Sequence, residues 1–439
     1  MSTPVPLRVA LAGLGTVGGG VAELLRRNAE IISQRAGRPV QLVAVADLDQ
    51  AKAKGLTGPD AQAFSDALEM LAAVKPDVLI ELIGGYGYAK TLVLGAIEAG
   101  VHVVTANKAL LAVHGNEIFP RAEARGVQVG FEASVAGGIP IIKALREGLA
   151  ANEIESVAGI INGTTNFILS EMRDKGLGFD EVLAQAQKLG YAEADPTFDV
   201  EGVDAAHKIT LLAAIAFGMP LAFDRAHVEG IRGLASIDIR HAEELGHRIK
   251  LLGITRRRPE GVELRVHPTL VPAKRLLANV EGAMNAVLVN GDAVGHTLYY
   301  GKGAGAAPTA SAVVADLIDL ARRHGCEGGM AVPHLGVAPQ WRRPLPVLPI
   351  EQVTSGYYLR LRVSDRPGVL ADITRVLAAE GISIDAFVQH EPQDGSGQTD
   401  VVLITHRCLE AAVMRATEQL EALDAVLMPP VRLRVESFS

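Results

Sequence analysis

LRVALAGLGTVG, residues 7–18, determines the fold expected for the N-terminal part of this chain. An apolar run of strand length leads directly into a glycine turn of the form G-x-G-x-x-G. The apolar residues after it, Val17, Val21, Leu24 and Leu25, recur at helical spacing. Strand, glycine turn and helix in this order are typical of the first unit of a dinucleotide-binding domain. The alternative is a turn that needs glycine for its backbone alone, and the flanking strand and helix favour the dinucleotide.

Each glycine of the turn has its own expected role. Gly13 permits the tight turn, Gly15 lets the backbone approach a pyrophosphate, and Gly18 lets the helix pack closely on the strand. The amides at the helix N-terminus would then face the diphosphate. The predicted cofactor contacts are therefore Gly13, Leu14, Gly15, Thr16, Val17 and Gly18.

A second apolar strand ends on Asp47, where a carboxylate would bind the 2′-hydroxyl of the adenosine ribose. A 2′-phosphate would instead need a basic partner. Ala46 offers none, although Lys52 and Lys54 follow shortly after. The sequence slightly favours NAD and leaves NADP open.

The alternation of apolar strands and helices continues beyond residue 47. Further strands are predicted at residues 76–84, 100–108 and 126–134, with helices at 89–99 and up to 125. This pattern predicts a parallel sheet covered on both faces, with its chemistry at the carboxyl ends of the strands. Thr105, Asn107 and Lys108 leave one such end. Lys108 could be an ordinary surface lysine at a helix start, but its place favours a role in the active site.

GYAEADPTFDVEGVDAAHK, residues 190–208, is rich in charge. Asp204 and Lys208 are four residues apart at the start of a predicted helix, so both face the same side. A carboxylate beside an ammonium can bind a polar, amino-acid-like substrate and donate a proton. The alternative is a solvated acidic loop followed by an ordinary ion pair.

The overall composition excludes several classes of protein. The 439 residues suggest two or three domains, and a net charge of −8 argues against a nucleic-acid partner. Cys326 and Cys408 lie far apart without ligand-like spacing, which favours a reducing cytoplasm. The N-terminus reads as a strand and not as a signal peptide, and the apolar run at 211–217 is too short to span a bilayer. We expect a soluble, cytoplasmic protein.

Taken together, these motifs resemble homoserine dehydrogenases. Residues 186–208 match that family's signature at Ala186, Gly190, Tyr191, Ala192, Asp195, Pro196, Asp199, Val200, Gly202, Asp204 and Lys208. Four further segments resemble the family's other landmarks in the same order: TANK (105–108), FEASVAGGIPII (131–142), INGTTNFIL (161–169) and GKGAGAAPTASAV (301–313).

The resemblance implies NAD(P)-dependent interconversion of L-aspartate 4-semialdehyde and L-homoserine, on the route to threonine, methionine and isoleucine. Lys208 would donate the proton to the aldehyde oxygen, and Lys108 would lie near the nicotinamide and substrate. Hydride delivery to an aldehyde leaves a developing alkoxide, which needs such a positive, proton-donating group. The implied substrate contacts are Glu193, Asp204, Gly190 and Asp199. The further implied cofactor contacts are Thr105, Lys108, Gly190, Gly303 and Gly305.

The resemblance also implies a monovalent cation, sodium or potassium, held around Glu132, Val135, Gly137 and Ile139. One carboxylate plus carbonyls on a glycine-rich turn suits a hard cation of low charge. The alternative is a strand-to-helix turn that needs Gly137 and Gly138 for its geometry alone.

Four parts of the chain are predicted. Residues 1–135, completed by 305–330, would form a Rossmann-type doubly wound domain. Residues 136–333 would form a mixed α+β domain for substrate binding and for assembly into a homodimer or homotetramer. Residues 334–355, with five prolines between 333 and 352, read as an extended connector in which Trp341 is expected to anchor by packing.

Residues 356–439 read as strand–helix–strand–strand–helix–strand, the ferredoxin-like order. The turn at Asp365, Arg366, Pro367, Gly368 and Val369 resembles the ligand turn of ACT domains, whose helix-start amides could receive a carboxylate. We expect feedback inhibition by threonine there. A domain kept only for assembly is the alternative.

Two other functions stay open at this stage. A nucleotide-binding sensor without chemistry would need neither Lys108 nor Lys208. Another amino-acid dehydrogenase would require a site that handles ammonia, which residues 190–208 do not resemble.

Overall fold

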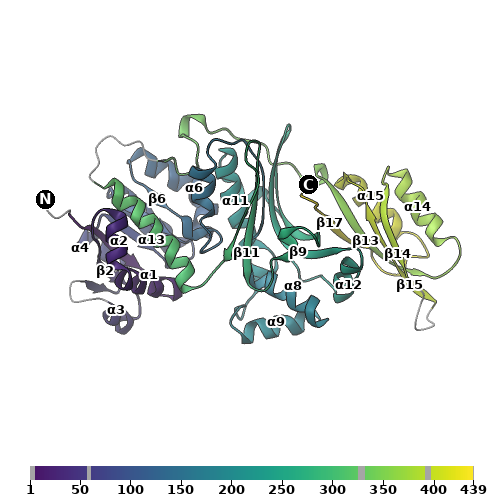
Figure 1. The fold of residues 1–439 in the computed structure, drawn as a ribbon, viewed down its shortest axis with the longest axis horizontal. Coiled ribbons are helices and arrows are strands. Elements are labelled where there is room, and N and C mark those ends of the chain that lie inside the picture. The colour runs from purple at the N-terminus through teal and green to yellow at the C-terminus, as the bar shows by residue number, and fades with distance from the viewer. Residues whose placement is uncertain (1–4, 57–60, 325–331, 391–396, 439) are drawn as a thin grey trace.

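The computed structural model describes residues 5–56, 61–324, 332–390 and 397–438. The chain is elongated, with a nucleotide-type sheet at one end, a large mixed sheet through the middle, and the C-terminal strands at the other end (Figure 1). Within the described residues, no helix is long and apolar enough to cross a membrane.

The first sheet has six strands in the order β3-β2-β1-β4-β5-β6, all parallel. The strands are β1 (Leu7–Ala12), β2 (Val40–Ala46), β3 (Gln62–Phe64), β4 (Val78–Glu81), β5 (His102–Thr105) and β6 (Val129–Gly130). The predicted doubly wound sheet is confirmed, and the order reverses at β1, so the crevice between β1 and β4 is where a nucleotide fits. The strand predicted at 126–134 is shorter than expected, because the chain turns into a 3₁₀ helix at Glu132–Ser134.

Helices cover both faces of this sheet. They include α1 (Thr16–Arg27), α2 (Ala29–Ala36), α3 (Gln50–Leu56), α4 (Ala67–Val74), α5 (Gly87–Glu98) and α6 (Lys108–Ala124). The helix α13 (Ala306–Arg323) returns from far along the chain and packs on α1, where Val313 and Leu317 join Val21 and Leu25 in one core. The sequence predicted that return.

The second sheet is mixed and has eleven strands. Nine follow the path β12-β11-β7-β9-β10-β17-β13-β15-β14, and β8 and β16 pair with β10 and β13 off this path. Its central strands are β7 (Ile154–Ile160), β9 (His247–Arg258), β10 (Gly261–Pro272), β11 (Met284–Gly291) and β12 (Gly295–Lys302), with β8 (His227–Val228) beside β10. Its helices are α8 (Gly163–Lys175), α9 (Phe179–Lys188), α10 (Thr197–Val200), α11 (Val203–Phe217) and α12 (Ser236–Glu244).

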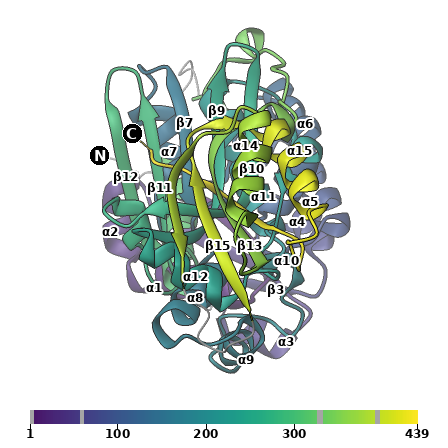
Figure 2. The same ribbon diagram turned by 90° about the vertical axis from the view of Figure 1, so that its right-hand side faces the viewer.

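The C-terminal unit continues this sheet instead of standing apart from it. Its strands are β13 (Thr354–Ser364), β14 (Ile384–Gln389), β15 (Gln398–Thr405) and β17 (Val431–Val435), with the short β16 (Cys408–Leu409) beside β13. The strand β17 pairs in parallel with β10, with Leu270 opposite Val435. The predicted ferredoxin-like order is present, and α14 (Val369–Ala379) and α15 (Glu410–Glu421) share one core on one face (Figure 2).

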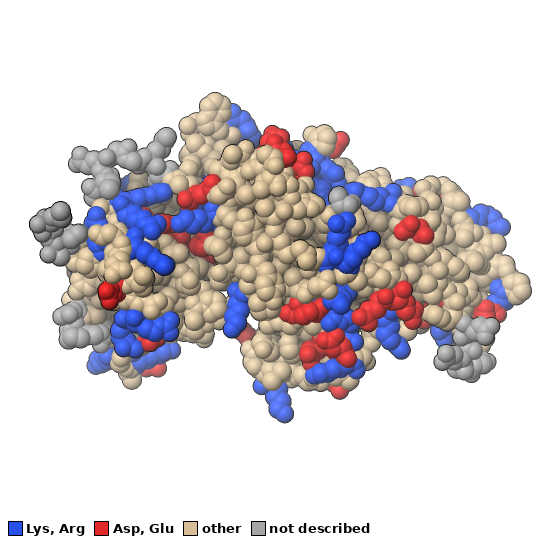
Figure 3. Space-filling model, in the orientation of Figure 1, with Lys and Arg blue, Asp and Glu red and all other residues tan. Residues whose placement is uncertain are grey.

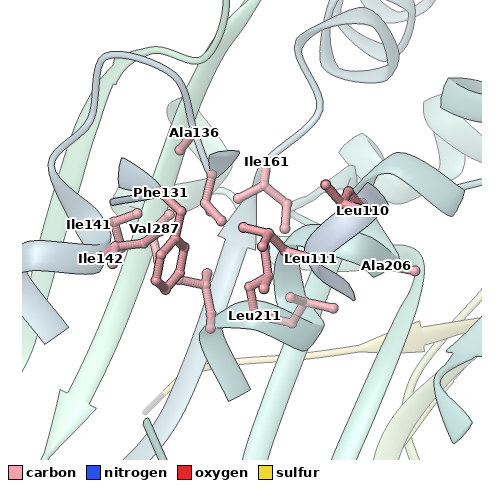
Figure 4. Close-up of a cluster of buried hydrophobic side chains, with 14 of the residues drawn as sticks. Leu110, Leu111, Phe131, Ala136, Ile141, Ile142, Ile161, Ala206, Leu211 and Val287 are labelled. Atoms are coloured by element: carbon pink, nitrogen blue, oxygen red, sulfur yellow. The ribbon is translucent and has the colours of Figure 1, made fainter. Parts of the chain in front are cut away.

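One buried cluster joins the two sheets. Leu110 and Leu111 of α6 meet Leu211 of α11 and Ile161, which follows β7 (Figure 4). Because α11 is buried along almost its whole length, side chains in its first turn are held in place from several directions. This core positions the site described below.

The connector before β13 runs along the molecule as expected, and Val262 donates its amide to the carbonyl of Pro346 at 2.8 Å. The prediction that Trp341 anchors it is wrong for this chain, since its side chain is 67% exposed. Basic and acidic side chains both occur across the face drawn in Figure 3, with no single basic surface spanning it.

Candidate active site

The first turn of α11 carries the central ion pair of the site. Gly202, in the left-handed region at φ 80°, ends the preceding turn and lets α11 begin at Val203. Asp204 and Lys208 then face the same side, and Lys208 Nζ lies 2.7 Å from Asp204 Oδ2. Both side chains are buried, so this is not the solvated pair of the alternative interpretation.

Lys108 completes a three-residue cluster. It is the first residue of α6, a helix capped by Asn107, whose side chain accepts the amide of Leu110. Its Nζ lies 3.3 Å from Asp204 Oδ1, so the two lysines share one carboxylate. Lys208 also donates to the carbonyl of Ile161 at 2.7 Å, which fixes its ammonium. Residues about a hundred positions apart in the chain are thereby brought together, while their predicted roles stay predictions.

Asn162 organises the acidic side of the cluster, a role that was not predicted although the residue lies in the quoted segment 161–169. It caps α8, where its side-chain oxygen accepts the amide of Thr165 at 2.8 Å. Its amide nitrogen donates to Asp204 at 2.8 Å and to Asp199 at 2.7 Å. The only local signal is a cap-type residue before a helix, which says nothing of its distant partners.

Burial and the neighbouring charges together set the pKa values of Asp204, Lys208 and Asp199. Burial alone would raise the pKa of Asp204, but Lys208 and Lys108 outweigh it and lower that pKa to about 2. Burial lowers the pKa of Lys208 below its ordinary value, and Lys108 adds to the effect while Asp204 opposes it. Burial and the neighbouring Asp204 raise the pKa of Asp199. An ammonium with a lowered pKa gives up its proton more readily.

An aromatic pair frames the cluster on one side. His207 lies between the rings of Phe198 and Phe223, with centroids 5.3 and 4.2 Å away. Burial lowers the pKa of His207 to about 4, so it is neutral at pH 7. Lys108 Nζ lies 5.9 Å from the centroid of Phe198, a cation–π geometry that holds this lysine at the wall of a pocket.

Two adjoining pockets lie at the carboxyl ends of β1, β2, β4 and β5. One of about 480 Å³ is lined by Gly13, Gly15, Ala46, Asp47, Leu48, Asp66 and Tyr88 among others. The other, of about 370 Å³, is lined by Val17, Gly84, Gly85, Tyr86, Asn107, Lys108 and Phe198 among others. Leu82 and Ile83 line both pockets, so together they form one run from the glycine turn to Lys108.

The glycine turn fits a bound diphosphate. A Cβ at Gly18 would lie 2.0 Å from the carbonyl oxygen of Gly13, and one at Gly13 would lie 2.6 Å from that of Leu82. Gly15 is different, because no protein atom lies within 4 Å of the place its Cβ would take. Gly15 thus opens onto the pocket, next to the amides that begin the twelve-residue helix α1.

Asp47 lies in the first pocket at the end of β2, as predicted. Its Oδ2 accepts the amide of Leu14 at 2.5 Å and its Oδ1 accepts that of Asp49 at 2.9 Å. The carboxylate therefore braces the glycine turn, a role that the sequence did not suggest. Each oxygen keeps a further lone pair with which a ribose hydroxyl could bond.

Glu81 is a second residue that sequence reasoning missed. It ends β4, is fully buried, and accepts the amides of Ile83 and Gly84 at 2.9 and 3.0 Å. Thr105, a predicted cofactor contact, donates its hydroxyl to Glu81 at 2.7 Å. Together they shape the loop between the two pockets. The signal available in the sequence was an acidic residue at the end of a buried strand.

The predicted cation residues lie in one turn with Glu132 at its start. The Glu132 carboxylate accepts the amides of Ile142 and Lys143 at 2.9 and 2.8 Å, and burial raises its pKa to about 7. Ala136 and Gly137 follow each other at φ 54° and 52°, an uncommon conformation for an alanine. Burial opposes the charged form of this carboxyl, so a cation bound beside it would stabilise the carboxylate. The set Glu132, Val135, Gly137 and Ile139 stays a prediction.

The remaining predicted residues lie further from the cluster. Glu193 and Gly190 belong to an exposed loop after α9, and the Glu193 carboxylate makes no hydrogen bond or ion pair with any described residue. A Cβ at Gly137 would lie 2.5 Å from the carbonyl oxygen of Gly303, so this glycine packs against the predicted cation turn. Gly305 precedes α13. None of these contacts tests their predicted roles.

The predicted regulatory turn lies at the far end of the molecule. Gly368 adopts φ 97° and precedes α14. Asp365, Arg366, Pro367 and Gly368 are outside the core, and Gln389 lies 3.4 Å from the Asp365 carboxylate. Cys408 is a free thiol, whereas Cys326 lies outside the described residues.

Three family models match successive parts of the chain. They are "Homoserine dehydrogenase, NAD binding domain" at residues 13–132, "Homoserine dehydrogenase" at 140–318 and "ACT domain" at 357–423. A homoserine dehydrogenase from Pseudomonas aeruginosa is 56% identical over 434 residues, which cover 99% of this chain and 100% of that one. The chain belongs to the homoserine dehydrogenase family. It is therefore an oxidoreductase with a nicotinamide-binding domain.

Other proteins similar to this chain are also homoserine dehydrogenases. A homoserine dehydrogenase from Neisseria gonorrhoeae is 56% identical, with 99% of each chain covered. The crystal structure of one from Thiobacillus denitrificans matches with a TM-score of 0.95 at 58% identity, covering all of both chains. The crystal structure of the homoserine dehydrogenase from Staphylococcus aureus at pH 7.5 matches with a TM-score of 0.74 at 32% identity, covering 98% of this chain and 99% of that one. The matched ranges follow the predicted parts in order, while the boundaries at 135, 333 and 355 stay predictions.

Proposed function

We propose that this chain interconverts L-aspartate 4-semialdehyde and L-homoserine at the cluster of Lys108, Asp204 and Lys208, with Lys208 as the proton donor. One observation carries the proposal: a buried lysine whose ammonium is fixed by Asp204 and by the carbonyl of Ile161, at 2.7 Å each. A fixed ammonium can face one developing negative oxygen without first reorganising.

The protonation of Lys208 determines how each direction of the reaction depends on pH. The bound nicotinamide supplies the hydride in the reductive direction. Lys208 donates its proton to the aldehyde oxygen, and its lowered pKa favours that transfer at neutral pH. Oxidation of homoserine needs Lys208 neutral, so that direction becomes faster at alkaline pH.

Lys108 has a complementary role at the pocket wall. It lines the second pocket and contacts Asp204 Oδ1, whereas Lys208 contacts Asp204 Oδ2. We assign Lys108 to orienting the substrate beside the nicotinamide. Asp204, Asp199 and Glu193, with the backbone at Gly190, would receive the substrate's ammonium group. Glu193 would have to reach the cluster by movement of its exposed loop.

The cofactor is proposed to be NAD(P)(H) with a slight preference for NAD. Asp47 offers an acceptor to a ribose 2′-hydroxyl, and Ala46 offers no charge to a 2′-phosphate. A hyperthermophilic archaeal homoserine dehydrogenase, solved in complex with NADPH, matches with a TM-score of 0.61 at 26% identity over 72% of this chain and 97% of that one. That relative supports a nicotinamide cofactor here and leaves the preference to measurement.

Regulation and assembly complete the proposal. The ACT unit would bind threonine at the turn 365–369 and reduce activity, as part of threonine, methionine and isoleucine biosynthesis in the cytoplasm. The chain would assemble as a homodimer or homotetramer. A sodium or potassium ion at the turn 132–139 would offset the charge of Glu132.

Initial rates of aspartate semialdehyde reduction test the assignment, with NADH and NADPH in turn and with or without threonine. We expect turnover with at least one cofactor and a higher kcat/KM with NADH. Lys208→Ala should lower kcat by more than about 100-fold, whereas Lys175→Ala, an exposed helical lysine in an i,i+4 pair, should not. Unchanged kcat in Lys208→Ala would favour Lys108 as the proton donor. Absence of turnover with both cofactors in the wild type would favour a protein without this chemistry.

A further inference from the structure

Three side chains outside the active site meet where α12 touches the C-terminal unit. His241 and Glu244 are three residues apart on α12 and face the same side. His390 directly follows β14 and comes from the ACT unit. Glu244 Oε2 lies 3.3 Å from His241 Nδ1 and 3.1 Å from His390 Nε2. One ligand atom from each of the three residues lies within 4.8 Å of the others.

We propose that His241, Glu244 and His390 bind one divalent transition-metal ion of the zinc type. Two imidazoles and one carboxylate are a donor set that such ions prefer. Two ligands about 2.1 Å from a tetrahedral ion lie about 3.4 Å apart. The observed separations of 3.3 and 3.1 Å are close to that value, so an ion could enter with small side-chain rotations.

The surroundings suit an ion that enters from solvent. The side chain of His241 is 8% exposed, whereas Glu244 and His390 are 48% and 61% exposed, which leaves an open side for entry and for a water ligand. The two ring centroids lie 6.2 Å apart with the planes 15° from parallel, so rotation of the exposed His390 ring would turn its nitrogen toward an ion held by His241 and Glu244. The Nε2 of His241 is buried and has no hydrogen-bond partner among the described residues, so no protein group fixes its tautomer from that side.

An ion bound at this position would link α12 to the ACT unit. The helix α12 lies at the junction of the central strands and the C-terminal strands (Figure 1). Asp238 on α12 already accepts hydrogen bonds from Tyr358 at 2.9 Å and from Arg360 at 2.6 and 3.0 Å, both on β13. A bound ion would add a second clamp, from α12 to β14, and would hold the ACT unit against the substrate-binding part.

Titration of the full-length protein, first stripped with a chelator, tests the site. Zinc chloride followed by calorimetry should show one tight ion per chain, and cobalt(II) should develop the visible absorption of a low-coordinate site. Zinc should also raise the midpoint of thermal unfolding. His390→Ala and Glu244→Gln should each weaken zinc binding by more than about ten-fold and remove that rise. His390 is exposed, so its variant should fold, and its basal turnover should equal that of the wild type.

His406→Ala is the matched control, because His406 is equally exposed on the same unit and lies 3.9 Å from Asp385. It should bind zinc as the wild type does. Absence of saturable binding by the wild type would overturn the proposal. So would an affinity unchanged in His390→Ala, since the ion would then lie elsewhere.

Discussion

Arg434 of the last strand forms a two-bond ion pair with Glu229, the residue after β8, at 2.8 and 3.0 Å. Arg434 is buried and also binds Glu410 at 2.6 and 2.7 Å. Glu229 also lies beside the chain that leads to the active site, because a Cβ added to Gly202 would come within 3.4 Å of the Glu229 carbonyl oxygen. The ACT unit is thereby connected to the start of α11, two residues before Asp204.

Glu229→Gln should destabilise the protein through this pair. Burial opposes ionisation of Glu229, but His227 and Arg434 hold its pKa well below the usual range. The side chain is 38% exposed and Arg434 keeps Glu410, so solvent screening limits the expected loss to about 1–2 kcal/mol. Urea unfolding at pH 7 measures it. Glu98→Gln, which breaks an exposed pair with Arg125, should cost less than about 0.5 kcal/mol.

The advantage of the wild type over Glu229→Gln should depend on pH in one direction. A carboxyl whose folded pKa is depressed stabilises the fold above its unfolded pKa of about 4.3, and that contribution is lost as pH falls toward the folded pKa. The difference in unfolding free energy should therefore be constant from pH 6 to 8 and shrink below about pH 4.3. A difference that stays constant down to pH 3 would contradict the pair as its origin.

The pH dependence of homoserine oxidation should report the pKa of Lys208, and two substitutions should shift that pKa in opposite directions. Asp204 raises that pKa and Lys108 lowers it. Asp204→Asn should then move the rising limb of the kcat profile to lower pH, and Lys108→Met should move it to higher pH. Profiles at saturating substrate measure the midpoints. The same midpoint in all three proteins would mean that another group titrates.

Asn162→Ala should separate two roles of one side chain. It removes the cap of α8 and the amide that bridges Asp199 and Asp204. We expect a loss of about 1 kcal/mol in stability and a fall in kcat/KM of at least about ten-fold, since the carboxylates lose their positioning. Asn162→Ser keeps a capping oxygen, so it should recover most of the stability but little of the kcat/KM. Full recovery of both would limit Asn162 to capping.

Local patterns predicted what depends on neighbours in the chain. The strand and glycine turn at 7–18, the Asp204–Lys208 pair and the ferredoxin-like order each follow from residues a few positions apart, and all are present. Asn162 lies 42 residues from Asp204, and Arg434 lies 205 residues from Glu229. No period or spacing connects such partners. The pairing of β17 with β10 was missed for the same reason, because a strand's pattern specifies its faces and not its neighbour.

Gly15→Ala should impair cofactor binding without destabilising the fold. No protein atom lies within 4 Å of the new methyl group, so the folded protein accepts it. The space it fills opens on the pocket where the pyrophosphate is expected, so the KM for the cofactor should rise by about ten-fold or more while the unfolding midpoint stays within about 1 °C. Gly19→Ala is the control. Gly19 lies on α1, a Cβ there would meet only the Leu14 carbonyl at 4.0 Å, and the variant's KM for the cofactor should not change.

Gly18→Ala should behave in the opposite way to Gly15→Ala, because a Cβ at Gly18 would lie 2.0 Å from the Gly13 carbonyl oxygen and must displace α1. Equal effects of Gly15→Ala and Gly19→Ala on the cofactor KM would remove the diphosphate from this turn.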